Sequence, residues 1–255
     1  MLTYLDIAGL PIGIDSSSEE IVFDSDEVTC TQCVVKIEDL SPALLNKSLR
    51  YPQNVYTHLN GLRRITDDTV WPDVYSHDIV FLPVGLLGIE YIKTHIFYSK
   101  PQGGKIACLV QVLAGELTVI LQKNAPLKSI YDEVIAEDSR IVDVKMGEKL
   151  AIPAGYYYTF INTGAEIVIF SLIVHKEIVI DYSQLRIKNG LAYYVIAKNA
   201  RQELVTNPKY RTPVEIKKIC ADELNCFSGY QPDIDMSLYQ EGITFVDSLC
   251  ALLGV

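Results

Sequence analysis

Residues 147–162 read Gly147-Glu148-Lys149-Leu150-Ala151-Ile152-Pro153-Ala154-Gly155-Tyr156-Tyr157-Tyr158-Thr159-Phe160-Ile161-Asn162, and this stretch decides the fold. Gly147 permits a turn between strands, and Pro153 and Gly155 make a second bend at the start of the next strand. Short apolar runs lie on both sides of that bend. We therefore expect two strands joined by a Pro-Ala-Gly turn, with the side chain of Tyr158 pointing into a barrel.

Apolar runs of strand length recur through most of the chain. No helical period separates them, and each is bounded by Gly, Pro, Asn or Asp. The runs are 78–82, 89–98, 106–113, 117–122, 141–144, 149–152, 157–162 and 167–174. Many short strands with turn signals are typical of an antiparallel sandwich or a closed barrel, and not of βαβ units.

The spacing G-x5-P-x-G-x2-Y-x3-N in residues 147–162 resembles the second motif of the cupins, which has His where this chain has Tyr158. The resemblance implies an all-β cupin barrel (a double-stranded β-helix or jelly roll), with short helices in the N- and C-terminal extensions. In cupins that histidine is a metal ligand, since neutral imidazole suits Fe, Mn, Ni or Zn. Tyrosine is a poor substitute, because its phenol ionises only near pH 10.

A longer part of the chain, residues 50–212, resembles the cupin-type phosphoglucose (glucose-6-phosphate) isomerases. The resemblance rests on several segments taken together, since each alone is weak. The segments are DIVFLPVG at 78–85, GIEYIKT at 88–94, VQVLAG at 110–115, VILQ at 119–122, IPAGYYYTFINTG at 152–164, DY at 181–182, NG at 189–190 and NPKY at 207–210. It implies isomerisation of a sugar phosphate between aldose and ketose forms, a divalent metal, and a homodimer.

Carried over position by position, the resemblance leaves no metal ligand in this chain. The family's two histidines fall on Phe97 and Ser99 if Thr94 is matched without a gap, and on Ser99 and Pro101 if the count starts from Gly115. Its glutamate falls on Cys108 and its last histidine on Tyr158. We therefore predict no metal and no other cofactor. The family reaction would lose a Lewis acid that contributes several kcal/mol, so any isomerase activity must use a changed mechanism.

Polar side chains remain that we expect to point inward from the strands at 91–99 and 156–162. The candidate ligand-binding residues are Lys93, Thr94, His95, Ser99, Cys108, Tyr156 and Tyr158, and the candidate catalytic residues are His95 and Tyr158. Such a lining can bind a phosphate or a carboxylate. Two alternatives stay open. Lys93 and His95 lie at the barrel rim or bond locally, or the two tyrosines fill the vacated metal cavity as core aromatics.

Composition limits the partners and the compartment. A net charge of -10 and a pI near 4.9, without any Lys/Arg cluster, argue against nucleic-acid binding. We read no signal peptide and no membrane-length apolar run, so we expect no membrane association and a cytoplasmic location. The expected partner is a small molecule such as a sugar phosphate. Cys30 and Cys33 form a lone CxxC that we interpret as incidental, with a zinc site shared with Cys220 and Cys226 as a weak alternative.

The ends of the chain differ from the middle. We expect an N-terminal extension at 1–54 with short strands and a helix at 41–49, a barrel at 55–212, and a helical extension at 213–255 packed on the barrel. Further short helices are expected at 199–205 and 213–220. The final residues repeat apolar side chains at helical spacing, which fits packing on the barrel or a dimer contact. Two functions stay open: an isomerase with a changed site, and a non-catalytic binding or structural cupin.

Overall fold

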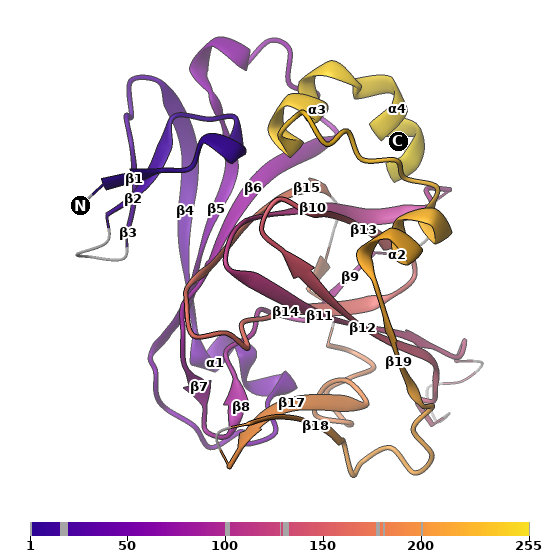
Figure 1. Cartoon of the computed structure of the whole chain (residues 1–255). Helices are drawn as coiled ribbons and strands as arrows, with labels where there is room; N and C mark the ends of the chain where they lie inside the picture. The colour runs from indigo at the N-terminus through magenta and orange to yellow at the C-terminus, as the bar shows by residue number, and fades with distance from the viewer. Residues whose placement is uncertain are drawn as a thin grey trace.

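The computed structural model describes residues 2–15, 20–99, 103–127, 129, 133–176, 179–180, 182–199 and 201–254. Two six-stranded sheets face each other and enclose the core (Figure 1). The first sheet has the order β13 (Lys149–Pro153), β10 (Ile106–Ala114), β15 (Val168–His175), β6 (Tyr75–Leu82), β5 (Asn54–Arg64) and β4 (Val28–Lys36). The second has the order β16 (Val179–Ile180), β9 (Phe97–Tyr98), β14 (Tyr157–Ile161), β11 (Glu116–Asn124), β12 (Ala136–Lys145) and β19 (Ile216–Ile219). The expected all-β cupin fold is confirmed.

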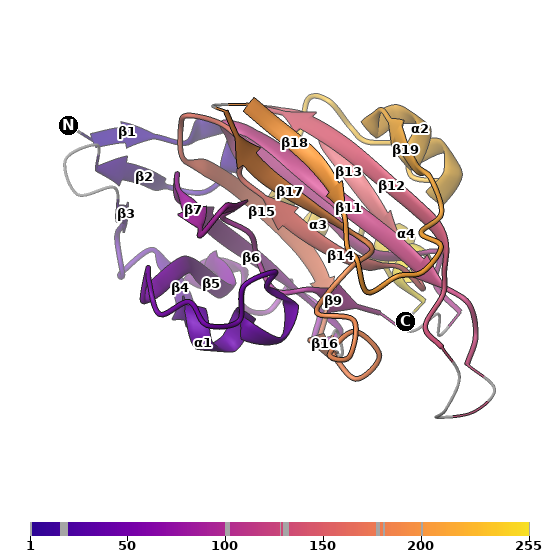
Figure 2. The same ribbon diagram turned by 90° about the horizontal axis from the view of Figure 1, so that it is seen from below.

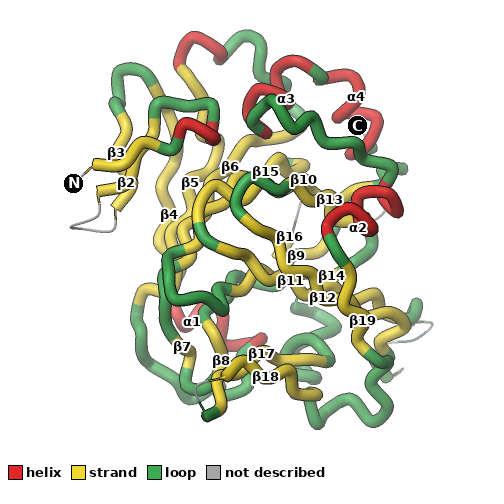
Figure 3. The backbone as a smooth tube through the Cα atoms, viewed as in Figure 1, coloured by secondary structure: helices red, strands yellow, loops and turns green. Residues whose placement is uncertain are grey.

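Smaller elements cover the ends of the two large sheets (Figures 2 and 3). One small sheet contains β1 (Leu2–Tyr4), β2 (Ile12–Asp15) and β3 (Glu20–Phe23). Another contains β7 (Leu86–Leu87), β8 (Glu90–Tyr91), β17 (Tyr193–Lys198) and β18 (Arg201–Thr206). The helices are α1 (Ile37–Leu40), α2 (Ala221–Ser228), α3 (Leu238–Thr244) and α4 (Val246–Leu253), with short 3-10 turns at Asp6–Ala8, Ser41–Ala43 and Ile65–Asp67. None of the helices described is long and apolar enough to cross a membrane.

Strand alternation decides which side chains fill the barrel. Val112 lies opposite Phe170, and Phe170 lies opposite Val80, so these three side chains share the inner face of the first sheet. Phe160 from β14 meets Phe170 across the barrel at a ring distance of 4.8 Å. All four are fully buried, and burial of each such side chain contributes about 1.5–3 kcal/mol. The hydrophobic pattern therefore fixes the register, because a one-residue slip would turn every side chain outward.

Four local expectations are wrong. The strand expected at 89–98 is broken into β8 and β9, with only an isolated bridge between Lys93 and Ile161 in the gap. The helix expected at 41–49 is only a 3-10 turn at Ser41–Ala43, which follows α1 directly. The helices expected at 199–205 and 213–220 are strands, β18 and β19. Asn199 adopts a φ of 52°, which lets the chain turn back and pair β18 with β17.

The C-terminal helices lie on the outside of the first sheet. Leu249 and Leu253 of α4 are buried in a cluster with Leu109 and Ile173, so the apolar side of this helix packs on the barrel. Lys149 forms a buried ion pair with Glu241 of α3. The helix expected at the end of the chain is confirmed, and its apolar face is occupied. The proposed boundaries at 54 and 212 stay a prediction, since β4 and β19 from the two extensions pair with barrel strands.

Candidate functional site

The positions of the family's metal ligands lie at the centre of the barrel and are filled by packed side chains. Phe97 and Tyr158 are paired residues of β9 and β14, with ring centroids 5.6 Å apart. Cys108 reaches the same point from β10 on the opposite sheet, where it is hydrogen-bonded to Tyr158. All three belong to the central hydrophobic cluster. Ser99 is half-buried just beyond β9, and Pro101 lies outside the described residues.

These donors do not fit a metal ion. Burial raises the pKa of the Cys108 thiol to about 12, although its hydrogen bond with Tyr158 acts in the opposite direction. Burial also raises the pKa of Tyr158 well above its usual value. Both groups are therefore protonated at neutral pH, whereas a metal needs the thiolate. Within the described ranges, no three His, Cys, Asp or Glu side chains are placed to share a metal.

Lys93 does not point into the barrel. Its ammonium group forms a buried ion pair with Glu90 and donates to the carbonyl of Ala43 at 2.9 Å. It also lies 5.2 Å from the ring centre of Tyr194. Lys93 was expected to point inward because it alternates with Phe97 on one strand, but the strand is broken at 92–96. Lys93 instead ties the chain at residue 43 to the sheet that contains β17.

Thr94 is completely buried and bonds to the backbone around it. Its hydroxyl donates to the carbonyl of His95 at 3.0 Å and accepts from the amide of Phe160 at 3.1 Å. These bonds replace the strand pairing that is missing between β8 and β9. The side chain is thus used to hold the irregular segment against β14.

His95 lies where this irregular segment approaches β5. Its Nδ1 is 2.9 Å from the hydroxyl of Tyr182, and its ring meets the edge of the Tyr56 ring at a centroid distance of 6.0 Å. Burial lowers the pKa of His95 to about 4, so the imidazole is neutral at pH 7. Neutral imidazole carries one donor and one acceptor, which suits contact with a hydroxyl group.

The structure adds His58 and Asp78, which the sequence did not single out as site residues. Nε2 of His58 is 3.0 Å from Oδ2 of Asp78, on the same inner face as Val80. Burial alone would raise the pKa of Asp78, but hydrogen bonds from His58, Gly61 and Ser76 overcome it and lower the pKa. His58 also acts electrostatically on His95. A usable signal was present: Tyr56 and His58 alternate on one strand and so share a face.

The side chain of Tyr156 contacts charged groups of β12. Its hydroxyl donates to Oδ2 of Asp138 at 2.7 Å, and the guanidinium of Arg140 lies 5.5 Å from its ring centre. Arg140 is stacked on its other side against Phe227 of α2 at 4.5 Å. Asp138 is shared with Lys217 at 3.1 Å. This network joins β12, β19 and α2 to Tyr156, the residue just before β14.

The cysteines do not form a shared site. The register of β4 shifts between Thr29 and Thr31. Cys30 packs against a hydrophobic cluster that includes Leu59 and Phe81. Cys33 lies opposite His58 and is exposed. Cys220 and Cys226 belong to the N-cap and the body of α2. All are free thiols. The zinc alternative therefore finds no support in the placement of these four residues.

Comparisons with known proteins identify one family. A family model described as Glucose-6-phosphate isomerase (GPI) matches residues 45–211. A search of curated proteins found no match. Similar solved structures include a sugar phosphate isomerase from a cupin superfamily of Silicibacter pomeroyi, with 12% identity and a TM-score of 0.30. The match covers 63% of this chain and 80% of that chain.

Two further solved structures are also similar to this chain. The CENP-C cupin domain of Drosophila melanogaster has 11% identity and a TM-score of 0.33, with 60% of this chain and 83% of that chain covered. A mutant of Bacillus subtilis oxalate decarboxylase has 13% identity and a TM-score of 0.34, with 49% and 28% covered. The assignment rests on the family match, which spans well over half of the chain. The chain belongs to the cupin-type glucose-6-phosphate isomerase family.

Proposed function

We propose that this chain is a metal-independent, non-catalytic member of its family that binds a small polar molecule. The observation that carries the proposal is the filled barrel centre. Phe97, Cys108 and Tyr158 occupy the metal-ligand positions as buried core side chains, and the Cys108 thiol and the Tyr158 phenol stay protonated. A substrate held there would have to displace the packing of the core.

Isomerisation between aldose and ketose forms needs a group that moves a proton between neighbouring carbons. Tyr158 is 1% exposed, so it has no access to a substrate. The ammonium of Lys93 is held by Glu90. His95 has a pKa of about 4, well below the range in which a histidine is an efficient general base or acid at neutral pH. These observations favour binding over the isomerase hypothesis.

The side chains best placed for a ligand are His58, Asp78, His95 and Tyr182, which we name the histidine cluster. Each is a hydrogen-bonding group, and the hydrogen-bond partners that the described residues give them include no lysine or arginine. Such a set suits the hydroxyl groups of a sugar better than a phosphate. We propose a polyhydroxy ligand as the partner, no nucleic acid, and a cytoplasmic location as the composition indicates.

A coupled assay that converts fructose 6-phosphate to glucose 6-phosphate tests the proposal. We expect no turnover, with or without added Fe, Mn, Ni or Zn, in protein purified without chelator. Titration of glucose, fructose and their 6-phosphates by NMR should shift the resonances of His58 and His95 and leave Tyr158 unchanged. Metal-dependent turnover would refute the proposal. Turnover that His95→Ala abolishes without metal would establish the isomerase with a changed site instead.

A further inference from the structure

The first large sheet ends at β4, and the middle residues of this strand are exposed to solvent. Among the strands described, β4 pairs only with β5. Thr31, Gln32, Cys33 and Val34 are all exposed, although consecutive residues of a strand point to opposite faces. Both faces of β4 and its free edge are therefore open to solvent at this point.

This edge lacks the features by which proteins usually prevent sheet edges from pairing. Residues 28–35 contain no Lys, Arg, Asp, Glu or Pro, although the chain carries a net charge of -10. Other edge strands do carry charges: β18 contains Arg201 and Glu203, and β19 contains Lys217 and Lys218. The strand β4 is thus an uncharged site for pairing in an otherwise acidic molecule.

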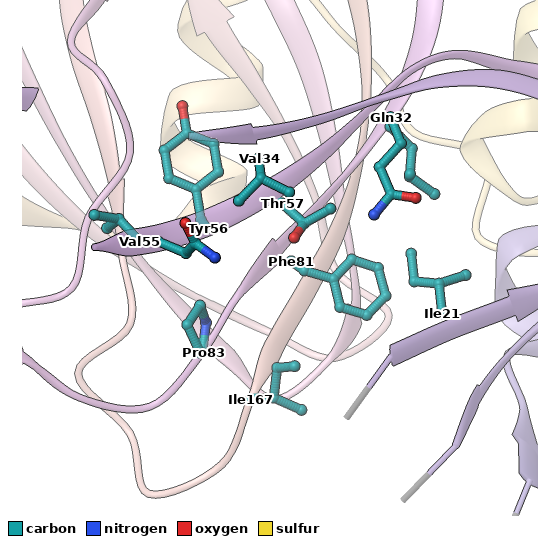
Figure 4. A pocket seen from close by; sticks show the side chains of 11 residues that line it. Ile21, Gln32, Val34, Val55, Tyr56, Thr57, Phe81, Pro83 and Ile167 are labelled. Carbon is teal, nitrogen blue, oxygen red and sulfur yellow. The ribbon is translucent and has the colours of Figure 1, made fainter. Parts of the chain in front are cut away.

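The uncharged surface continues from β4 onto the outer face of the sheet. A groove of about 420 Å³ opens there, with side chains of β4, β5 and β6 along its floor (Figure 4). It is lined by Ile21, Gln32, Val34, Asn54, Val55, Tyr56, Thr57, Leu59, Phe81, Pro83 and Ile167. No charged side chain is among them. An uncharged centre of this kind is what distinguishes the middle of a protein interface from its rim.

Charges return at the two ends of β4, with opposite signs where an antiparallel partner would bring them together. Asp24, Asp26 and Glu27 precede the strand, and Lys36 ends it. If two copies pair about a two-fold axis near Gln32, Glu27 lies beside the partner's Lys36, and symmetry repeats the contact. Further charges of both signs flank the two ends: Arg63, Arg64, Glu38 and Asp39.

We propose that the free edge of β4 is an interface between two copies of this chain, paired antiparallel so that their six-stranded sheets become one continuous sheet. Backbone hydrogen bonds across the edge would supply the affinity, and the terminal charges would set the register. The helix α4 is not available for this role, because its apolar side packs on its own barrel. The interface does not depend on whether the barrel binds a ligand or catalyses a reaction.

Light scattering on the full chain tests the interface. We expect a mass of twice 28.5 kDa that falls toward 28.5 kDa on dilution. Val34→Lys puts a charge into the uncharged centre of the paired edge, so it should weaken the dimer at least tenfold. Leu204→Lys is the matched control, since Leu204 is also an exposed apolar residue of an edge strand, and should leave the mass unchanged. Circular dichroism checks that both variants stay folded.

A charge exchange tests the register and the identity of the partner. Glu27→Lys and Lys36→Glu should each weaken the dimer, and the two together should restore it, because opposite charges then face each other again. Mild oxidation should link Cys33 of one copy to Cys30 of the other, which this register places opposite it, and Cys33→Ser should abolish the link while Cys220 and Cys226 remain. A monomer at every concentration, or a dimer that Val34→Lys leaves intact, would overturn the proposal.

Discussion

Tyr158 and Cys108 come from opposite sheets and are hydrogen-bonded to each other at the centre of the barrel, where both side chains are buried. Two family positions that would share a metal ion thus stabilise the core by direct contact. Neither group is ionised at neutral pH. A metal ion at this position would be a buried charge that needs ligands, whereas the neutral pair of Tyr158 and Cys108 can be buried without them.

Substitutions at Tyr158 should affect stability and not activity. Tyr158→Phe removes the hydroxyl partner of Cys108, at a cost of about 0.5–1.5 kcal/mol in the free energy of unfolding. Tyr158→Ala opens a cavity and should cost about 3–5 kcal/mol. Urea unfolding measures both, with Tyr51→Phe as a control, since Tyr51 is 73% exposed. A fully stable Tyr158→Ala protein would show that the centre is not packed as described.

The cysteines should differ in their reaction with iodoacetamide. Cys33, Cys220 and Cys226 are exposed and should be alkylated in the native protein, whereas Cys108 is buried with a pKa raised to about 12. Mass spectrometry of tryptic peptides should find Cys108 labelled only after denaturation. Labelling of Cys108 at the rate of Cys220 in folded protein would mean that the barrel centre is open to solvent.

Buried histidines should make stability depend on pH. Burial lowers the folded-state pKa of both His77 and His95 to about 4 from 6.5. Above pH 6.5 they are neutral in both states, so this stability is fully present. As the pH falls from about 6.5 to 4 the unfolded chain gains protons first, and each histidine costs up to about 1.4 kcal/mol per pH unit.

Variants identify the histidines responsible for this loss. His77→Phe keeps ring packing against Trp71 and Tyr239 but cannot titrate, so its unfolding free energy should fall less between pH 7 and pH 5. If His77→Phe and the wild type lose stability in parallel, His77 is not buried as a neutral ring.

The pair of Lys93 and Glu90 should be strongly coupled. Lys93→Met leaves the Glu90 carboxylate buried without its cation and should cost about 3–5 kcal/mol. Glu90→Gln can still accept from the amide of Leu45, so the double variant should recover a large part of that loss. A double-mutant cycle in urea measures the coupling. If the losses of unfolding free energy of the two single variants simply add, Lys93 and Glu90 are not paired, and Lys93 is again a candidate for contact with a ligand.

The sequence predicted the strands well where local signals set them. Gly147, Pro153 and Gly155 mark turns, and alternation around them gave β13, β14 and β15 with nearly their observed bounds. It failed at 92–96, because the chain leaves the sheet there to satisfy the contacts of Lys93 and Thr94 with distant segments. The prediction that alternate side chains share a face assumes a continuous strand. A break in the strand changes the face to which the following side chains point.

The histidine cluster was harder to predict than the barrel. His58 and Asp78 are twenty positions apart and meet only because β5 pairs with β6 in one register. His95 and Tyr182 meet across a still longer separation. No local pattern records such contacts. The filled metal site, in contrast, follows from single positions of a motif, so the loss of ligands at Cys108 and Tyr158 was visible in the sequence.

The strand β19 pairs parallel with β12 and completes the second sheet from residues 216–219, beyond the stretch that the family match covers. During synthesis on a ribosome, the strands up to β18 emerge before this strand does. Until β19 arrives, β12 has an unprotected edge that a chaperone or another nascent chain can pair with. The second sheet is therefore complete only after residue 219 has been made, and a stalled chain that stops at residue 212 should be prone to aggregation.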